Sequence, residues 1–391
     1  MKRNFSVIFI LLACIMMIGC FTGFIKKSAL ADEITELNTK SKAAYLIEPE
    51  SGTIIYSSGE NKRMPIASMC KIMTLLLCFE SIDNGELRFD EKILISNTAA
   101  GMGGSQVFLE ANAEYLAGDL IKSIVVASAN DACVAMAERI CGTEAEFVNL
   151  MNKKAKALNM NDTVFVNCTG LPCAGQYSSA SDVAKMFIEL TKHQDYFKFS
   201  KIWTDKIFHP KDRVTDISNT NKLVRFYQGC EGGKTGYTVE AGHCLAAVAC
   251  KNNTKLISIV IGAPDSKTRF FEVSSMFNYG FTNYVNKVLI DKNTPLELSV
   301  KVEGGKKDTI SVIAEHSFNL FTKKGEKRAI ETEFVPIEKI KAPIKQGDLV
   351  GHVNLYENGI KIKEISVLSN EDVLKKTYFD MLKDVINNWA L

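Results

Sequence analysis

The first regular pattern of apolar and polar positions is a pair of short β-rich runs. Residues 43–47 and 53–56 lie on either side of Glu50-Ser51-Gly52, and this arrangement predicts a hairpin. After Pro65, an apolar run over residues 72–79 predicts a buried helix. A second apolar run covers 120–126, helices are expected at 131–140, 147–158 and 270–285, and strands are expected at 236–238, 244–250 and 256–262. Helices interleaved with hairpins predict an α/β (α+β) layered fold whose sheet is covered on both sides.

After about residue 291 the pattern shortens to a period of two. Apolar residues alternate with polar ones over residues 296–302, and similar short alternations recur at 310–312, 350–355 and 360–367. Glycines separate these runs, and Asn358-Gly359 is typical of a tight hairpin. The sequence therefore predicts a small all-β domain over residues 292–368.

The last residues return to a helical period. Ser369, with Asp372 three residues later, is expected to cap a helix over residues 369–391. A helix of this kind that ends in Trp is able to lie in a bilayer interface, and membrane association is expected. The alternative is that the helix docks on its own domain or on a second subunit. Its apolar face is formed by Leu374, Tyr378, Met381, Leu382, Val385 and Trp389.

Residues 1–31 have the features of a signal peptide. Lys2 and Arg3 precede an apolar run over residues 5–18, and Ala29-Leu30-Ala31 has the small-x-small form of a signal-peptidase site. Export of the protein is therefore predicted. Two alternatives remain open: the run is an uncleaved anchor, or Cys20 is lipidated.

Composition narrows the class of protein. A chain of 391 residues is long enough for two domains, and an apolar content of 46% with 24% charged residues is ordinary for a globular protein. A net charge of +2 without a basic stripe argues against a nucleic-acid partner. Five scattered histidines and no Cys-x-x-Cys argue against a metal site. Several of the eleven cysteines lie in apolar stretches and are expected to be buried, while pairing of Cys168 with Cys173 stays open.

Three short motifs carry the candidate chemistry. Ser68-Met69-Cys70-Lys71 opens the first apolar helix, where an i,i+3 spacing places the lysine amine on the same face as the serine hydroxyl. Ser128-Ala129-Asn130 and Lys234-Thr235-Gly236 follow, the latter within a strand pattern. Each motif alone is common by chance, but the ordered set matches the signature of serine β-lactamases and penicillin-binding proteins.

The residue types of the first two motifs suit acyl transfer to a serine. We expect Ser68 to be the nucleophile and Lys71 the general base that takes its proton. Ser128 would relay a proton to the leaving nitrogen. Asn130, with a donor and an acceptor, would hold a substrate amide.

The third motif suits the other end of a substrate. Lys234 and Thr235 would bind an anionic terminus, and Gly236 would permit close approach of a substrate main chain. The main-chain N–H groups of Ser68 and Tyr237 are the candidates for an oxyanion site.

The chain resembles the low-molecular-mass penicillin-binding proteins that are D-alanyl-D-alanine carboxypeptidases. The resemblance covers about residues 40–391. Its departures from the usual pattern are Ala129, Gly233 and the loop cysteines Cys168 and Cys173. It implies that Arg269 helps to hold the carboxylate of the substrate. Beyond the three motifs, it rests on Gly170-Leu171, Tyr177-Ser178-Ser179-Ala180, Asp182, Asn219-Thr220-Asn221 and Glu231-Gly232-Gly233.

The resemblance implies a complete organisation. Residues 32–288 would be a β-lactamase/transpeptidase-like catalytic domain, followed by the β-rich domain and the C-terminal helix. The enzyme would remove the terminal D-alanine from peptidoglycan pentapeptide stems through an acyl-serine intermediate, without a cofactor, in cell-wall biogenesis and cell shape. Penicillin and other β-lactam antibiotics would acylate it. The C-terminal helix would hold it on the outer face of the cytoplasmic membrane.

Two other functions remain to be weighed. A β-lactamase of class A uses a glutamate after the second motif, but residues 162–167 contain none, and those enzymes lack a C-terminal β-domain. A non-catalytic wall-binding scaffold of the same fold is the other alternative. The presence of every catalytic residue type argues against it.

Overall fold

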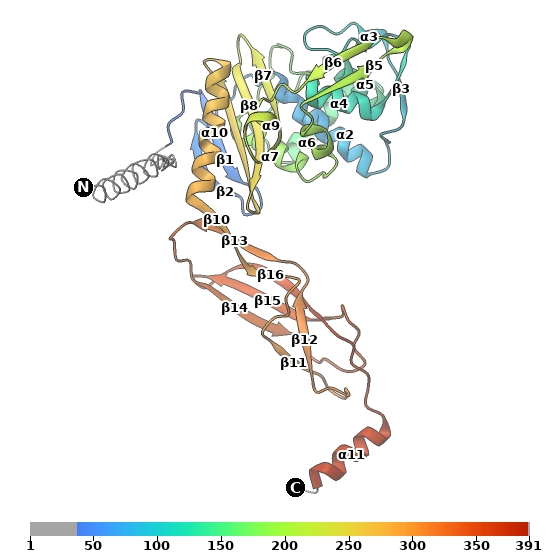
Figure 1. The fold of residues 1–391 in the computed structure, drawn as a ribbon, viewed down its shortest axis with the longest axis vertical. Coiled ribbons are helices and arrows are strands. Elements are labelled where there is room, and N and C mark those ends of the chain that lie inside the picture. Colours follow the sequence, from blue (N-terminus) through green and yellow to red (C-terminus); the bar gives the residue numbers. More distant parts are fainter. Residues whose placement is uncertain (1–36, 390–391) are drawn as a thin grey trace, which may run out of the picture. The chain divides into compact units, whose positions relative to one another are not determined.

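The computed structural model describes residues 37–389 (Figure 1). The predicted signal peptide and its alternatives, the uncleaved anchor and the lipidated Cys20, lie outside the described residues.

The first elements are the antiparallel strands β1 (Ala43–Glu48) and β2 (Thr53–Ser58), which confirm the predicted hairpin. Gly52 in the turn has a φ of 71°, a conformation that glycine adopts without strain.

Five antiparallel strands form the central sheet, in the order β2-β1-β9-β8-β7. Its later strands are β7 (Cys230–Thr238), β8 (Gly242–Lys251) and β9 (Thr254–Ala263). Successive residues of β8 and β9 are buried, which requires cover on both faces of the sheet, as the sequence predicts. The helices α10 (Ser266–Asn283) and α7 (Ala180–Leu190) provide contacts to these strands. Strand β7 is left at one edge.

A cluster of helices surrounds α2 (Lys71–Asp83), which follows the 3-10 turn η2 (Ala67–Cys70). Residues 72–79 of α2 are all buried, and the helix contacts α4, α5, α6 and α7. Because neighbouring helices cover α2 on several sides, its sequence has no polar face. The neighbouring helices are α4 (Ala117–Ala127), α5 (Asn130–Cys141) and α6 (Glu144–Ala157). The short helices are α3 (Asn97–Ala100), α8 (Tyr196–Ser200), α9 (Leu223–Phe226) and η3 (Pro210–Asp212). Two small two-stranded sheets pair β3 (Lys92–Leu94) with β4 (Glu114–Leu116) and β5 (Thr204–Phe208) with β6 (Val214–Ser218).

The helix expected at residues 270–285 has different ends. Helix α10 begins earlier because the Asp265 side chain accepts a hydrogen bond from the N–H of Thr268, which caps the first turn. It ends at Asn283 because the chain enters β10 (Tyr284–Ile290), which pairs with β13 (Phe318–Lys323). The domain boundary expected between residues 288 and 292 therefore includes the last residues of β10, which ends at Ile290.

The C-terminal part is all-β, as predicted, with its own apolar core. Its five-stranded sheet has the order β11-β12-β16-β15-β14. The Asn358-Gly359 turn joins β15 to β16 with φ values of 51° and 77°, which confirms the tight hairpin. The sequence pattern did not predict β13 or β14, and β14 has no buried face that would produce an alternation. The strands are β11 (Ser299–Lys301), β12 (Thr309–Ala314), β14 (Ile330–Pro336), β15 (Leu349–Glu357) and β16 (Ile360–Ser369).

The prediction that Ser369 caps the last helix is wrong. Ser369 is the last residue of β16, and the following segment is tied to the β-domain because Val373 is buried in its core. The helix α11 (Tyr378–Trp389) instead begins after Thr377, whose hydroxyl accepts from the N–H of Asp380 while the Asp380 carboxylate accepts from the N–H of Thr377. Within residues 37–389, no helix combines the length and apolar character that crossing a membrane requires.

Candidate active site

Ser68 lies in η2, directly before α2. Ala67 before it has a φ of 47°, a strained conformation for a residue with a Cβ, which is typical of functional turns. Lys71 follows one turn later, with its Nζ 3.2 Å from Ser68 Oγ. Ser68 is partly exposed, whereas Lys71 is fully buried. The first motif therefore forms the expected pair of an accessible hydroxyl and an amine behind it.

Three oxygen atoms surround the Lys71 amine. Besides Ser68 Oγ, they are Oδ1 of Asn130 at 2.6 Å and the main-chain carbonyl oxygen of Thr169. The last two only accept hydrogen bonds, whereas a hydroxyl both donates and accepts. A neutral Lys71 amine can therefore keep its two N–H bonds on these acceptors and turn its lone pair to the Ser68 hydroxyl. This is the geometry that a general base needs.

Asn130 begins α5 and links Lys71 to a glycine-rich segment. Its Oδ1 accepts from Lys71, and its Nδ2 donates to the carbonyl oxygen of Gly103 at 2.7 Å. The next residue, Gly104, has a φ of 79°, and a Cβ there would lie 2.8 Å from Nδ2 of Asn130. Both ends of the amide are thus held within the protein. To hold a substrate amide, as the sequence predicts, Asn130 has to share or exchange one of these bonds.

Ser128 lies where the chain passes from α4 to α5. It has φ 64° and ψ 31°, a left-handed conformation that costs about 1–2 kcal/mol for a residue other than glycine. In this position Ser128 Oγ accepts a hydrogen bond from Lys234 Nζ at 2.7 Å. The second and third motifs are therefore joined by one buried contact.

Asp131, the residue after the second motif, holds this junction in place. Its buried carboxylate accepts hydrogen bonds from the main-chain N–H groups of Val107, Leu109 and Ala132. Burial raises the pKa of the Asp131 carboxyl, and these N–H donors oppose that change. Asp131 acts through the position of its neighbour Asn130 and is a positioning residue. Sequence reasoning did not assign it a role.

Lys234 in β7 is 1% exposed and donates to Ser128 Oγ and to the Thr235 carbonyl oxygen. Burial lowers the pKa of the Lys234 amine well below its ordinary value, and the charges of Lys71 and Arg269 lower it further. In the part of the chain that the structure describes, no carboxylate hydrogen-bonds to Lys71 or Lys234. A protonated Lys71 or Lys234 would therefore carry a positive charge that no carboxylate neutralises, and such a charge suits an anionic terminus.

Strand β7 comes closest to the nucleophile at Gly236. A Cβ at this position would lie 2.7 Å from the Ile66 carbonyl oxygen and 3.2 Å from the Ser68 nitrogen, so a glycine is required. The ring of Tyr237, 58% exposed, stacks on His243 with 4.4 Å between ring centres, which agrees with a structural role for that histidine. The main chains of Ser68 and Tyr237, expected to form the oxyanion site, thus lie in adjacent segments.

Arg269 lies in the first turn of α10. Its Nη1 donates to the carbonyl oxygens of Gly236 at 3.1 Å and Cys244 at 3.4 Å. The guanidinium therefore contacts the main chain of the third motif and adds positive charge near Lys234. Its implied contact with a substrate carboxylate stays a prediction.

The nine cysteines within residues 37–389 are all free. Cys168 is buried and Cys173 is exposed, so the pairing left open by the sequence is not formed. Cys70, between the two members of the first motif, is buried and its thiol donates to the Asn167 carbonyl oxygen at 3.3 Å. Cys70 is therefore a packing residue and faces away from the Lys71 amine.

Two groups of the site act through the main chain, so their own side chains give no signal in the sequence. They are the carbonyl oxygens of Thr169 and Gly103, which hold Lys71 and Asn130. Gly170, which follows Thr169, has a φ of 80°, and a Cβ there would lie 2.1 Å from the Ala67 carbonyl oxygen. A glycine at position 170 was the one signal that could have located this contact.

Comparisons with known proteins give matches over most of the chain. Residues 29–265 match the family described as D-alanyl-D-alanine carboxypeptidase, and residues 284–375 match the C-terminal domain of penicillin-binding protein 5. The chain is 40% identical to D-alanyl-D-alanine carboxypeptidase DacF of Bacillus subtilis over 91% of this chain and 92% of that protein.

Solved structures of penicillin-binding proteins are also similar to this chain. Penicillin-binding protein 5 from Haemophilus influenzae is similar with a TM-score of 0.68 and 26% identity, over 87% of this chain and 99% of that one. Penicillin-binding protein D2 from Listeria monocytogenes, in its ampicillin-bound form, is similar with a TM-score of 0.56 and 30% identity, over 63% of this chain and 99% of that one.

The low pKa of the Lys234 amine predicts a cost in stability. The unfolded chain holds the Lys234 proton up to about its ordinary pKa of 10.5, whereas the folded protein releases it at lower pH. Between these two pKa values the unfolded state binds more protons, so the free energy of unfolding rises with pH. We expect Lys234→Met to raise the free energy of unfolding by about 1–2 kcal/mol near pH 7 and to weaken this pH dependence.

Urea unfolding of both proteins near pH 7 and near pH 10 measures this effect. Lys153→Met, at an exposed position of α6, is the matched control and should change neither quantity. A Lys234→Met protein that is less stable near pH 7, with the pH dependence of the wild type, would contradict the prediction.

Proposed function

The chain belongs to the D-alanyl-D-alanine carboxypeptidase family, and on this premise we propose that Ser68 carries the acyl group in its reaction. The protein is a serine-type hydrolase that acts on peptides ending in D-Ala-D-Ala, and we propose peptidoglycan pentapeptide stems as its substrate. The observation that supports Ser68 is the 3.2 Å contact from Ser68 Oγ to a Lys71 amine whose other partners are both acceptors.

In the acylation step, Ser68 Oγ attacks the carbonyl carbon of the penultimate D-alanine. The Lys71 amine takes the hydroxyl proton as the new C–O bond forms. The main-chain N–H groups of Ser68 and Tyr237 stabilise the negative charge on the carbonyl oxygen. The closeness of Gly236 to the Ser68 nitrogen supports this pairing of two segments.

The leaving D-alanine is handled by the second and third motifs. Its carboxylate binds at Lys234 and Thr235, with the charge of Arg269 behind them. Ser128 gives its proton to the leaving nitrogen as the C–N bond breaks, and the proton that the Lys71 amine took from Ser68 passes to Ser128, so both amines end the step as they began. The hydrogen bond from Lys234 holds Ser128 Oγ in place. Asn130 positions the amide of the substrate and the Lys71 amine together.

Water then hydrolyses the acyl-serine ester, which frees Ser68 and the shortened peptide. The proposed cycle uses only groups of the chain and the substrate, and it needs no cofactor. A β-lactam presents an amide carbonyl and a carboxylate in the same relation as the D-Ala-D-Ala end. We therefore propose that penicillin acylates Ser68.

The β-lactamase alternative has less support. A fast hydrolase of penicillin needs a base that activates water against the acyl-serine, and in class A enzymes this base is a glutamate. Lys71 is contacted by Ser68, Asn130 and a carbonyl oxygen, and within residues 37–389 no carboxylate hydrogen-bonds to it. A non-catalytic scaffold would have no need for the buried Lys71 amine beside the accessible Ser68 hydroxyl, so this alternative also has less support.

We propose that the protein is exported and works on the outer face of the cytoplasmic membrane, held there by α11. Support comes from the exposed apolar side chains of this helix. They include Tyr378, Phe379, Met381, Leu382, Val385 and Ile386.

Release of D-alanine tests the proposed reaction. The substrate is diacetyl-Lys-D-Ala-D-Ala, and we expect the wild type to release free D-alanine and Ser68→Ala to release none above background. A loss of at least about 10³-fold is expected because the nucleophile itself is removed. Lys153→Met should keep wild-type activity. Equal activity in Ser68→Ala would show that another residue carries the acyl group.

Binding to vesicles tests the role of α11. The wild type should bind vesicles of phosphatidylcholine, a zwitterionic lipid without net charge. The double variant Leu382→Glu/Val385→Glu should bind at least about tenfold more weakly, because charges replace two apolar contacts. Lys383→Gln, on the same helix, should bind like the wild type to these uncharged lipids. If the double variant sediments with vesicles as well as the wild type does, α11 is not the membrane contact.

A further inference from the structure

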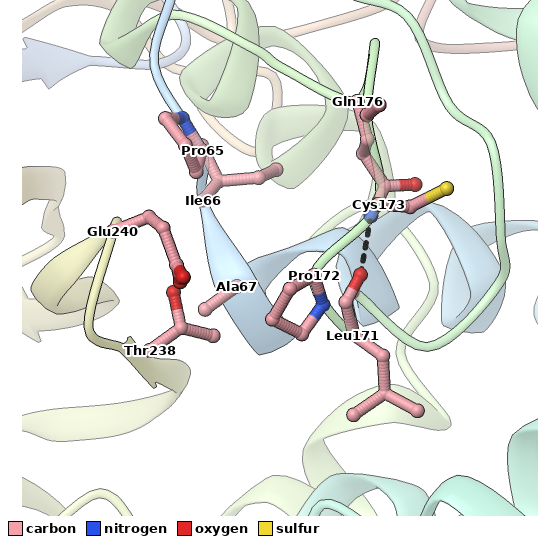
Figure 2. A pocket seen from close by; sticks show the side chains of 11 residues that line it. Pro65, Ile66, Ala67, Leu171, Pro172, Cys173, Gln176, Thr238 and Glu240 are labelled. Atoms are coloured by element: carbon pink, nitrogen blue, oxygen red, sulfur yellow. Dashed lines mark hydrogen bonds between the residues drawn. The ribbon is translucent and has the colours of Figure 1, made fainter.

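A pocket with a volume of about 370 Å³ is lined by the residues that directly precede Ser68 and by two other segments (Figure 2). One wall is formed by the residues just before Ser68, including Ile66 and Ala67. The second wall is the loop of residues 170–176, and the third is formed by Thr238 and Glu240 after strand β7. In Figure 2, Glu240 and Thr238 lie on one side of the pocket and Leu171, Pro172 and Cys173 on the other.

The loop wall has a fixed shape. Oε1 of Gln176 accepts hydrogen bonds from the N–H groups of Val166 and Asn167 at 2.9 and 3.0 Å. The Asn167 side chain in turn accepts from the Gly170 nitrogen and donates to the Leu171 carbonyl oxygen. These bonds close the loop on itself. Hydrogen bonds within the protein therefore hold the apolar side of the pocket in shape.

The position of the pocket relative to β7 defines which part of a substrate enters it. Strand β7 is at the edge of the sheet, so an extended peptide can pair with its free side. If Lys234 and Thr235 bind the terminal carboxylate, as the proposed function states, the acyl part of the peptide continues past Tyr237. It then reaches Thr238 and Glu240, and the pocket receives a side chain from the acyl side of the scissile bond.

Glu240 is the one charged side chain among the eleven residues that line the pocket. It is exposed, and no ion pair or hydrogen bond engages its carboxylate in the described part of the chain. The other polar side chains of the lining are engaged: Gln176 holds the loop, and the Thr238 hydroxyl accepts from the Ala241 nitrogen at 3.0 Å. The pocket thus combines apolar walls with a single unpaired carboxylate.

We propose that this pocket selects substrates with an aliphatic side chain that ends in an ammonium group, on the acyl side of the scissile bond. The methylene groups of such a side chain would pack on Ile66, Leu171 and Pro172, and its ammonium group would reach Glu240 near solvent. An anionic side chain would be repelled, and a neutral one would leave Glu240 without a partner. The inference rests on the proposed function, which sets the direction of the peptide.

Two peptides that differ in one charge test the proposal. They are Nα-acetyl-Lys-D-Ala-D-Ala, with a free side-chain ammonium group, and the Nα,Nε-diacetyl form, in which that group is a neutral amide. For the wild type we expect kcat/KM to be about three- to tenfold higher for the charged peptide, as for a partly exposed ion pair. In Glu240→Gln this ratio should fall to about one, and in Glu240→Lys it should fall below one.

Two further variants separate recognition from a general effect of charge or folding. Glu240→Asp keeps the carboxylate on a shorter side chain and should retain part of the preference. Glu86→Gln removes the same charge from an exposed position beyond the C-terminal end of α2, and should keep both the wild-type activity and the wild-type ratio.

The outcomes are distinct. A Glu240→Gln protein that keeps the wild-type preference overturns the inference and leaves the proposed function standing. The same holds if the wild type cleaves both peptides equally well. If the wild type releases D-alanine from neither peptide, the proposed function fails, and this inference fails with it.

Discussion

Two buried lysine amines in one site are the constraint on which the rest of the structure depends. Burying an amine costs free energy unless hydrogen bonds replace its water, and two like charges in one site increase that cost. Over residues 37–389, the partners of Lys71 and Lys234 are hydroxyls, an amide oxygen and carbonyl oxygens. These uncharged partners satisfy the hydrogen-bonding capacity of the two amines, and no carboxylate forms an ion pair with either amine. A lysine held in this way can exchange a proton with a serine beside it, which a salt-bridged lysine cannot do as readily.

The site is rigid because three separate parts of the fold meet there. The turn η2 and helix α2 supply Ser68 and Lys71, the α4–α5 junction supplies Ser128 and Asn130, and the edge strand β7 supplies the third motif. Two of these parts are fixed by groups that have no reactive role. The Asp131 carboxylate holds the junction, and the missing side chain of Gly236 lets β7 approach Ser68. Reactive groups on helices and strands, supported by buried hydrogen bonds, keep the geometry that catalysis requires.

Much of this arrangement could be predicted from the sequence, because the chemistry resides in side chains at fixed spacings. The motifs predicted the meeting of Ser68 with Lys71, and turn residues such as Asn358-Gly359 predicted local hairpins. The failures have a common cause in tertiary contacts. Ser369 has the local features of a helix cap, but its strand pairing and the burial of Val373 override them. The carbonyl of Thr169 contacts Lys71 only because the loop packs there, and no residue type encodes such a contact.

The most direct measurement of the central claim, that Ser68 and Lys71 form one nucleophile–base pair, is mass spectrometry of the protein after incubation with penicillin. The wild type should gain one penicilloyl group, located by peptide mapping on the segment that contains Ser68. Lys71→Met, verified as folded by circular dichroism, should gain none in the same time, because its serine hydroxyl has no base. Acylation of Lys71→Met at the wild-type rate, or a wild-type adduct on a residue other than Ser68, would contradict the claim.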